Sequence, residues 1–388
     1  MSIRRKRRKL RHRKIEDLVG IGFVVCIMIF AIINILTPTQ ESSERENRTL
    51  AQKPTATWTS ILSGNYMEQY EEYQADQFFA RDFWRSVKLG LNRFSGSRKE
   101  NGVYIGKDGY LLEDIVIPDR ETLQINLDAI ESFAKEHEEL ETSMILVPDA
   151  ANVLKEKLPA FVQLVDQSRY MSRVKKQLSS SLNWIDAEAV MNKHKDEKIY
   201  YKTDHHWTTK GAYYVFQEAA KVLDLDYEKD GYVFYPVTKT FNGTLAAKSG
   251  YRLDENEEIG IYVPQIEDKD LIVNYVEEQR KTASLYDSSK LEERDKYGVY
   301  LGGNSPLIDI QTVSESERRL LIFKDSYANC FVPFLTPYFR EIVLVDPRYY
   351  TGTIEDIMQT YQFTDVLFLY SGNMFFQDNN INGVINGE

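Results

Sequence analysis

The apolar residues of the chain form one long N-terminal run followed by a body of shorter periodic segments. Residues Leu18 to Leu36 carry no charged side chain and one polar amide, Asn34. A helix rises about 1.5 Å per residue, so a run of this length crosses a hydrocarbon core of about 30 Å. The pattern therefore predicts one transmembrane helix over residues 18–36.

Behind this run, short apolar segments alternate with segments of helical periodicity. Strands are predicted at 143–147, 184–186, 198–201, 319–323, 341–345 and 365–369. Helices are predicted at 119–140, 170–178, 187–193, 209–222 and 328–335. This alternation is typical of an α/β fold with a mostly parallel sheet and helices on both faces. Functional sites in such folds gather at the carboxyl ends of the strands.

Other segments depart from this rhythm. Residues 37–60 are polar and contain Pro38 and Pro54, which indicates a linker, and 65–94 have the spacing of an amphipathic helix that packs on the domain. A hairpin is predicted over 101–111, around a Lys-Asp-Gly turn. Residues 226–318 are rich in Tyr, Glu, Asp and Lys and form an insertion that either shapes a groove or covers the sheet. The predicted division is a basic tail (1–17), an anchor (18–36), a linker with its helix (37–100) and an α/β domain (101–388).

Charge assigns an orientation to the predicted anchor. Residues 1–14 hold nine Lys and Arg and no acidic residue. The positive-inside rule then places the N-terminus in the cytoplasm and the body outside, as a single-pass protein of the cell membrane. A cleaved signal peptide is the competing interpretation, but no small-x-small site follows Leu36. The rest of the chain has 39 basic and 59 acidic residues, a balance that argues against nucleic-acid binding.

The chemistry suggested by the sequence centres on Asp204-His205-His206-Trp207, between a predicted strand and helix. In an extended loop residues i and i+2 point the same way, so Asp204 can face His206. A carboxylate that orients one imidazole nitrogen leaves the other free to take a proton from a nucleophile. Ser326 follows the apolar strand 319–323 at a predicted strand-to-helix turn, where backbone N–H groups can stabilise an oxyanion. We therefore predict a triad of Ser326, His206 and Asp204.

Several neighbours are secondary candidates for oxyanion or substrate binding. They are Asn373, Arg348, Tyr327, Asp325, His205 and Trp207. Trp207 would wall the loop, Asn373 could donate its amide to an oxyanion, and Arg348 could bind a charged group. Both Asn373 and Arg348 could equally satisfy loop carbonyls, and Ser326 or Asp325 could be a helix N-cap. A metal site of Asp204, His205 and His206 is a further alternative, although three adjacent ligands on one loop have poor geometry for one ion.

The motifs together resemble a known family. Asp204-His205-His206-Trp207 is the signature of the bacterial DHHW family, and further blocks match in family order: 46–48, 76–82, 101–111 and 324–327. That family is similar to the AlgJ/AlgX-type alginate O-acetyltransferases. The resemblance implies a three-layer α/β/α domain of the SGNH-hydrolase type with permuted motif order, in which Ser326 is nucleophile, His206 base and Asp204 orienter. Lys324 stands where many such enzymes have Gly, which leaves the oxyanion donors open.

The expected function is a membrane-anchored, extracytoplasmic serine acyltransferase or esterase that O-acetylates an exported or cell-wall polysaccharide, with no cofactor. By resemblance, its acetyl donor is a multi-pass membrane acyltransferase. A non-catalytic polysaccharide-binding or assembly protein on the same fold is the main alternative, and a metal-dependent hydrolase is a third. The sequence does not distinguish transfer from hydrolysis.

Overall fold

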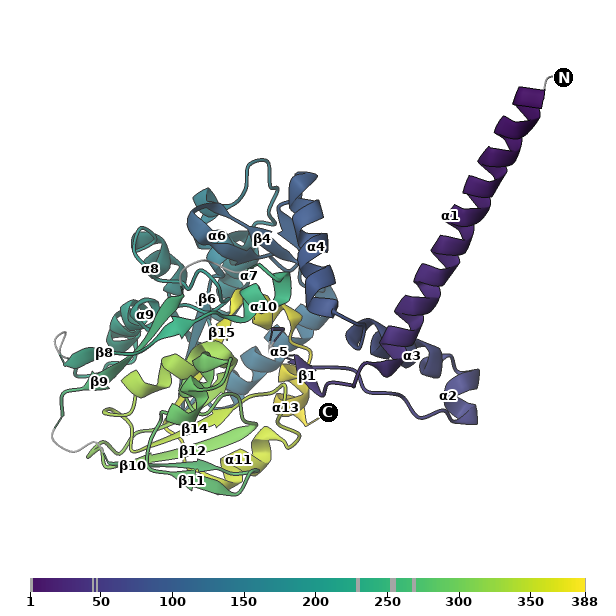
Figure 1. The fold of residues 1–388 in the computed structure, drawn as a ribbon. Helices are drawn as coiled ribbons and strands as arrows, with labels where there is room; N and C mark the ends of the chain where they lie inside the picture. Colours follow the sequence, from purple (N-terminus) through teal and green to yellow (C-terminus); the bar gives the residue numbers. More distant parts are fainter. Residues whose placement is uncertain are drawn as a thin grey trace. The chain divides into compact units, whose positions relative to one another are not determined.

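The computed structural model describes residues 3–43, 45–46, 48–227, 231–251, 256–266 and 270–387. Asn47 of the 46–48 motif and three short stretches of the 226–318 insertion lie outside these ranges. The chain forms two compact units, residues 1–95 and 96–388 (Figure 1).

The first unit begins with the long helix α1 (Ile3–Leu36). Its segment Glu16–Leu36 is long enough, and apolar enough on average, to cross a membrane. The predicted span at 18–36 lies within this helix. A small two-stranded ladder, β1 (Ser42–Ser43) with β2 (Arg48–Thr49), follows it.

Three helices complete this unit: α2 (Trp58–Leu62), α3 (Asn65–Asp76) and α4 (Arg81–Phe94). The single helix predicted over 65–94 is therefore wrong in its middle. Ala80 has a left-handed backbone with φ of 53°, so it cannot continue the right-handed helix. The chain turns there, and α4 starts in a new direction.

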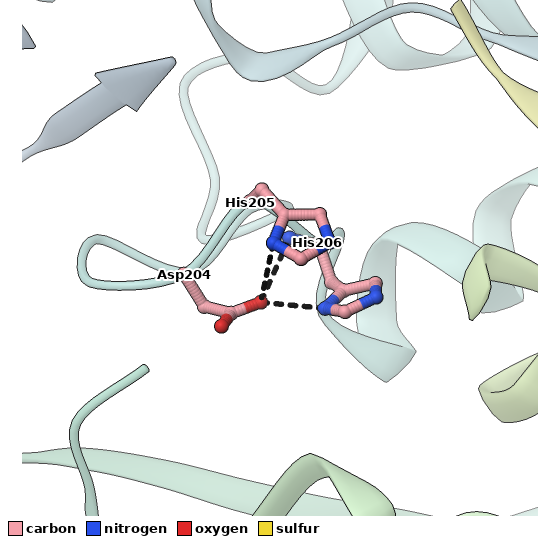
Figure 2. A group of neighbouring side chains, drawn as sticks. All are labelled: Asp204, His205 and His206. Carbon is pink, nitrogen blue, oxygen red and sulfur yellow. Dashed lines mark hydrogen bonds and ion pairs between the residues drawn. The ribbon is translucent and has the colours of Figure 1, made fainter. Parts of the chain in front are cut away.

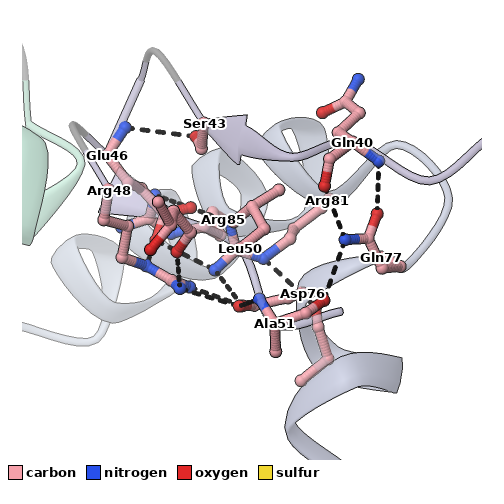
Figure 3. Close-up of polar contacts among 12 residues, drawn as sticks. Gln40, Ser43, Glu46, Arg48, Leu50, Ala51, Asp76, Gln77, Arg81 and Arg85 are labelled. Atoms are coloured by element: carbon pink, nitrogen blue, oxygen red, sulfur yellow. Dashed lines mark hydrogen bonds and ion pairs between the residues drawn. The ribbon is translucent and has the colours of Figure 1, made fainter. Parts of the chain in front are cut away.

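A cluster of ion pairs ties the polar segment after α1 to α3 and α4 (Figure 3). Glu46 pairs with Arg48, Arg81 and Arg85, and Asp76 binds Arg48 at 2.7 and 2.5 Å. The Arg48 hydrogen bond lowers the pKa of the Asp76 carboxyl. Both carboxylates are largely shielded from solvent, so these pairs are screened less than exposed ones. The cluster therefore fixes a stretch that its composition alone identifies as a linker.

The second unit is built on an eight-stranded sheet with the order β11-β10-β12-β14-β13-β15-β6-β7. Its strands are β6 (Glu141–Val147), β7 (Asn183–Ile185), β10 (Leu271–Tyr275), β11 (Arg280–Thr282), β12 (Leu307–Thr312), β13 (Arg319–Lys324), β14 (Glu341–Val345) and β15 (Asp365–Ser371). The five strands from β14 to β7 are mutually parallel, and β12, β10 and β11 add to them antiparallel. The mostly parallel sheet is confirmed, and part of the insertion extends it.

Alternating strand residues face two separate cores. Ile145 and Val147 of β6 belong to one apolar cluster, and Met144 and Leu146 to the other. The first cluster includes residues of α6 (Ala150–Val153), α8 (Ala187–Lys193) and α9 (Thr209–Val222). The second includes residues of α5 (Arg120–Glu136), α7 (Gln167–Leu178), α11 (Ile354–Thr360), α12 (Gly372–Gln377) and α13 (Ile381–Asn386). Helices thus cover both faces of the sheet in three layers.

Two smaller sheets accompany the main one. The predicted hairpin is present as β4 (Val103–Ile105) and β5 (Leu111–Glu113), with β3 (Lys99–Glu100) beside it. Within the insertion, β8 (Tyr232–Phe241) pairs with β9 (Glu257–Pro264), and α10 (Thr244–Ser249) lies between them in sequence. The position of α10 matters because its first residues reach the candidate site.

Candidate active site

Ser326 stands directly beyond the central strand β13. The strand ends at Lys324, and the chain continues into a short 3-10 turn, Ser326–Cys330, followed by a second at Val332–Phe334. The regular helix predicted over 328–335 is therefore replaced by two tight turns, the second containing Pro333. Ser326 is 8 % exposed, at the carboxyl edge of the sheet. The strand-to-turn geometry presents its hydroxyl where functional groups gather in parallel sheets.

Asp204 and His206 lie on a tight loop between α8 and α9. The strand predicted at 198–201 is absent; only an isolated bridge joins Tyr200 to Trp207. The backbone there bonds within its own loop, from Tyr201 N to the carbonyl of His206, instead of to a sheet neighbour. The Asp204 carboxylate accepts both the backbone N–H of His206 at 3.0 Å and its Nδ1 at 2.5 Å. A turn, and not an extended segment, brings the two side chains together.

The loop and the turn meet in a chain of hydrogen bonds from Asp204 through His206 to Ser326, here called the relay. His206 Nε2 lies 2.7 Å from Ser326 Oγ, and Figure 2 shows its Nδ1 facing Asp204. With Nδ1–H donating to the carboxylate, Nε2 is free to accept the hydroxyl proton. The three predicted residues are thus brought together in the order hydroxyl, imidazole and carboxylate.

The start of α10 completes the carboxylate's hydrogen bonds. The backbone N–H of Thr244 and its hydroxyl donate to Asp204 Oδ2 at 2.7 and 2.9 Å. Gly243 lies so close that a Cβ there would stand 2.3 Å from the Asp204 Cβ. Neither Gly243 nor Thr244 is among the site residues predicted from the sequence. An Asn-Gly-Thr stretch signals a turn and a helix start, but not which distant side chain they meet.

Aromatic rings enclose the imidazole. Tyr297 stacks on His206 with centroids 3.7 Å apart and ring planes 8° from parallel. Trp207 is fully buried, and its indole N–H donates to the Tyr327 carbonyl at 3.1 Å. Tyr327 in turn donates its hydroxyl to the His205 carbonyl at 2.5 Å. Trp207 and Tyr327 therefore connect the loop to the turn that carries Ser326. Tyr297 is not among the site residues predicted from the sequence.

Burial and charge set the protonation states. Burial alone would raise the pKa of Asp204, but the charges of His206 and His205 and the hydrogen bonds hold it well below its usual range. Burial lowers the pKa of His206 to about 4, His205 acts in the same direction, and Asp204 opposes both. At neutral pH the pair is therefore a carboxylate and a neutral imidazole, the form that a general base requires.

Asn373 is held by several partners. Its Nδ2 donates to the Asp114 carbonyl at 2.9 Å, and its Oδ1 accepts from Val116 N at 3.0 Å. Its backbone N–H donates to Asp149 at 2.7 Å. Burial raises the pKa of Asp149 to about 7, with Gln167 and Asn373 opposing. The hydrogen bonds of Asn373 thus match the loop-satisfying role predicted as its alternative.

A cavity of about 410 Å³ opens beside this group. Its lining includes Asp149, His205, Thr244, Ser371 and Asn373. The backbone and hydroxyl of Ser371, at the end of β15, both donate to Asp325 at 2.8 Å. The cavity therefore borders the edge of the sheet that carries the relay.

Arg348 and Asp325 have structural partners. Arg348 binds Asp346 through two hydrogen bonds, at 2.8 and 2.6 Å. Asp325 accepts from the backbone of Tyr327 at 2.8 Å, the N-cap interaction that was the alternative for this segment. Lys324 is fully buried, 3.5 Å from Asp346, and its ammonium donates to Asn329 at 2.8 Å. A buried ion pair thus underlies the turn at the position where many enzymes of the SGNH type have Gly.

His205 shares the loop but not the relay. Its Nδ1 lies 2.7 Å from Thr244 Oγ1, whose own proton goes to Asp204. Asp204, His205 and His206 each offer one ligand atom, all within 4.8 Å of one another. Both Asp204 oxygens and both His206 nitrogens already have protein partners. A metal at this position would have to replace those hydrogen bonds.

Comparison with known proteins identifies the relationship. The family model described as DHHW protein matches residues 163–345, which carry all three relay residues. The predicted resemblance is thereby confirmed. Comparison with curated protein sequences found no match.

Solved structures agree on the fold of this DHHW region and its surroundings. A DHHW family protein from Eubacterium siraeum has a TM-score of 0.64 and 23 % identity, covering 75 % of this chain and 96 % of that one. PatB1 of Bacillus cereus, solved with a sulfonyl adduct, has a TM-score of 0.60 and 20 % identity, covering 72 % and 97 %. The O-acetyltransferase domain of Pseudomonas putida AlgJ has a TM-score of 0.47 and 16 % identity, covering 74 % and 99 %, and supports no conclusion by itself. The first two establish a shared fold.

Proposed function

We propose that this protein is a membrane-anchored serine acyltransferase or esterase, with Ser326 as nucleophile, His206 as general base and Asp204 as the residue that orients the imidazole. The observation that carries the proposal is the relay from Asp204 through His206 to Ser326, with distances of 2.5 and 2.7 Å. A serine hydroxyl becomes a competent nucleophile when a neutral imidazole can take its proton.

The reaction follows from these positions. Ser326 Oγ attacks an ester carbonyl while His206 Nε2 takes the hydroxyl proton, and the leaving alcohol departs with that proton. This leaves the acyl group on Ser326. His206 then removes a proton from an acceptor hydroxyl, whose oxygen takes the acyl group, and His206 returns that proton to Ser326 Oγ as the ester bond to serine breaks. A sugar hydroxyl as acceptor gives transfer, and water gives hydrolysis.

The substrate assignment rests on resemblance. The similarity of the motifs to AlgJ/AlgX-type O-acetyltransferases favours acetyl as the acyl group and an exported or cell-wall polysaccharide as the acceptor. It also favours a multi-pass membrane acyltransferase as the donor partner. PatB1, with its sulfonyl adduct, supports covalent chemistry on this fold, because sulfonyl reagents modify activated nucleophiles. The apolar α1 and the basic residues before it favour an anchored body outside the cytoplasm.

Intact-mass analysis of the full chain in detergent, after exposure to p-nitrophenyl acetate, tests the nucleophile. We expect one acetyl group on the wild type and none on Ser326→Ala, with ester turnover reduced about a thousandfold or more. Ser249→Ala is the matched control: this serine is also buried, but its hydroxyl donates to the Leu245 carbonyl within α10. Equal labelling of wild type and Ser326→Ala would refute the nucleophile.

The two alternatives predict different results. A polysaccharide-binding or assembly protein would give no adduct with any activated ester but would retain affinity for its polymer. A metal-dependent hydrolase is favoured only by the proximity of Asp204, His205 and His206. It would copurify with about one equivalent of metal and lose turnover on chelation.

A further inference from the structure

Helix α4 has an apolar side that stays largely exposed. At 3.6 residues per turn, five large apolar residues fall on one arc of about 100°. They are Phe83, Trp84, Val87, Leu91 and Phe94. Across the fully described α4 no side chain is buried, and Leu91 is 63 % exposed. Such a continuous apolar arc on a soluble surface marks a binding face.

The beginning of α4 is attached to the membrane helix. The ring of Trp84 lies against that of Phe30 in α1, with centroids 6.2 Å apart. Asn34, the single polar residue of the predicted span, accepts a hydrogen bond from Phe79 N at 2.8 Å and donates to Gln74 at 3.2 Å. The end of α3 and the turn after it thus satisfy the amide within the predicted span, where an unpaired polar group would be costly.

These contacts fix a depth for Trp84. Phe30 precedes the end of the apolar run, Leu36, by six residues, or about 9 Å along the helix axis. An amphipathic helix in a membrane interface buries its apolar face by about 5–10 Å. A residue beside Phe30 therefore lies at interfacial depth once α1 spans the bilayer.

The side of α4 opposite the apolar arc is mainly polar and basic, and Arg81 and Arg85 on it pair with Glu46. The helix carries four basic residues, Arg81, Arg85, Lys88 and Arg93, against one acidic residue, Asp82. The chain after its basic tail is strongly acidic, so α4 departs from its surroundings. Basic residues on one side and Phe, Trp and Leu on the other are the composition of helices that lie in a membrane interface.

We infer that α4 lies in the lipid interface of the membrane that α1 crosses, with its apolar arc inserted and its polar side toward the headgroups. This inference depends on the proposed anchor and not on the proposed reaction. The ion pairs of Glu46 and Asp76 link α4 to the segment after α1, so interface and anchor would form one attachment. The first unit would then contact the membrane through both α1 and α4.

Site-directed spin labelling of the full chain in phosphatidylglycerol-containing nanodiscs tests the inference. A nitroxide is placed at Leu91→Cys on the apolar arc, at Ser86→Cys about 140° away on the polar side, or at Val24→Cys in α1. Cys26 is replaced by Ala, and the parent without an added cysteine gives the background from buried Cys330. Collision with oxygen, which concentrates in lipid, is compared with collision with a water-soluble nickel chelate.

We expect the ratio of oxygen to nickel accessibility to be high at positions 24 and 91 and several-fold lower at 86. Nickel access at 91 equal to that at 86 would place the arc in water and overturn the inference. Shielding of 91 from both reagents would place it against protein, as the sequence pattern predicted for 65–94, and would overturn it equally. Nickel access at 24 would remove the anchor itself, a failure distinct from that of α4.

Discussion

A methyl group at Gly243 should disable the relay from a distance. In Gly243→Ala the new Cβ would stand 2.3 Å from the Asp204 Cβ and 2.4 Å from its Oδ2. Real Cβ contacts start near 3.0 Å, so the carboxylate or the start of α10 must move by more than half an ångström. Asp204 has no exposed surface into which it could move. The hydrogen bonds from Thr244 and to His206 would be strained together.

The size of the effect follows from the displacement. A misplacement of about 1 Å in a catalytic group costs about a hundredfold in rate. This corresponds to about 2.7 kcal/mol in the activation free energy. The added methyl should also destabilise the fold, by about 1–3 kcal/mol for an overpacked core. Loss of activity should therefore appear at temperatures where the variant is still folded.

The assay is kcat/KM for an activated acetyl ester, beside thermal unfolding followed by circular dichroism. Proton NMR adds a readout independent of any substrate, because the short Nδ1–H bond of His206 to Asp204 should give a far-downfield resonance in the wild type. That resonance should shift or disappear in Gly243→Ala. Gly298→Ala is the matched control in the same insertion, since the three heavy atoms nearest its Cβ would all be in the Lys290 side chain, at 3.4 to 3.7 Å.

Gly243→Ala with activity within twofold of Gly298→Ala and an unchanged imidazole resonance would refute the reasoning. It would mean that Asp204 can move without consequence. Loss of activity together with loss of the folded state at the assay temperature would call for the same comparison at lower temperature, where the fold is retained.

Two further predictions concern protonation. Because burial lowers the pKa of His206 to about 4, kcat/KM should stay level as pH falls to about 5 and drop only as protonation removes the base near pH 4; a pH–rate profile breaking near 6.5 would contradict this. Burial raises the pKa of Asp149 to about 7 in the folded chain, against 3.8 in the unfolded chain, so the folded state keeps this carboxyl protonated over that range. The free energy of unfolding of the wild type should therefore fall by about 4 kcal/mol as pH rises from 3.8 to 7. Asp149→Asn should remove that loss. If urea unfolding instead gave the wild type and Asp149→Asn the same change in free energy of unfolding between pH 4 and pH 8, Asp149 would ionise normally.

The sequence predicted those parts of the fold that depend on local pattern. The apolar runs at 319–323 and 341–345 are strands, and the periodic segment 209–222 is a helix with the same bounds. Each is defined by residues adjacent in sequence and buried on both faces or along one stripe. The prediction of a strand at 198–201 is wrong because the backbone of this apolar, aromatic run forms its hydrogen bonds within its own loop and not with a sheet neighbour. Pattern alone does not distinguish these two outcomes.

The candidate site divides in the same way. The relation between Asp204 and His206 is local, and the separate motif around Ser326 supplied the third group. Thr244 and Tyr297 come from the insertion, whose sequence signals turns and aromatic packing without indicating a partner. Their positions depend on how α10 and the following loops fold back across the edge of the sheet. Contacts of this range are properties of the assembled fold.

The hydrogen bonds of Trp207 and Tyr327 hold the loop that carries His206 against the turn that carries Ser326 through contacts of the chain itself. In the proposed reaction such a site would be preorganised, because no closing motion would be needed to bring His206 and Ser326 together. An acylated Ser326 would meet water as readily as a sugar. Any preference for transfer over hydrolysis would then have to come from how well the cavity beside His205 retains an acceptor and excludes solvent. The choice between transfer and hydrolysis would then depend on the lining of that cavity, whereas Ser326, His206 and Asp204 would supply only the reactivity.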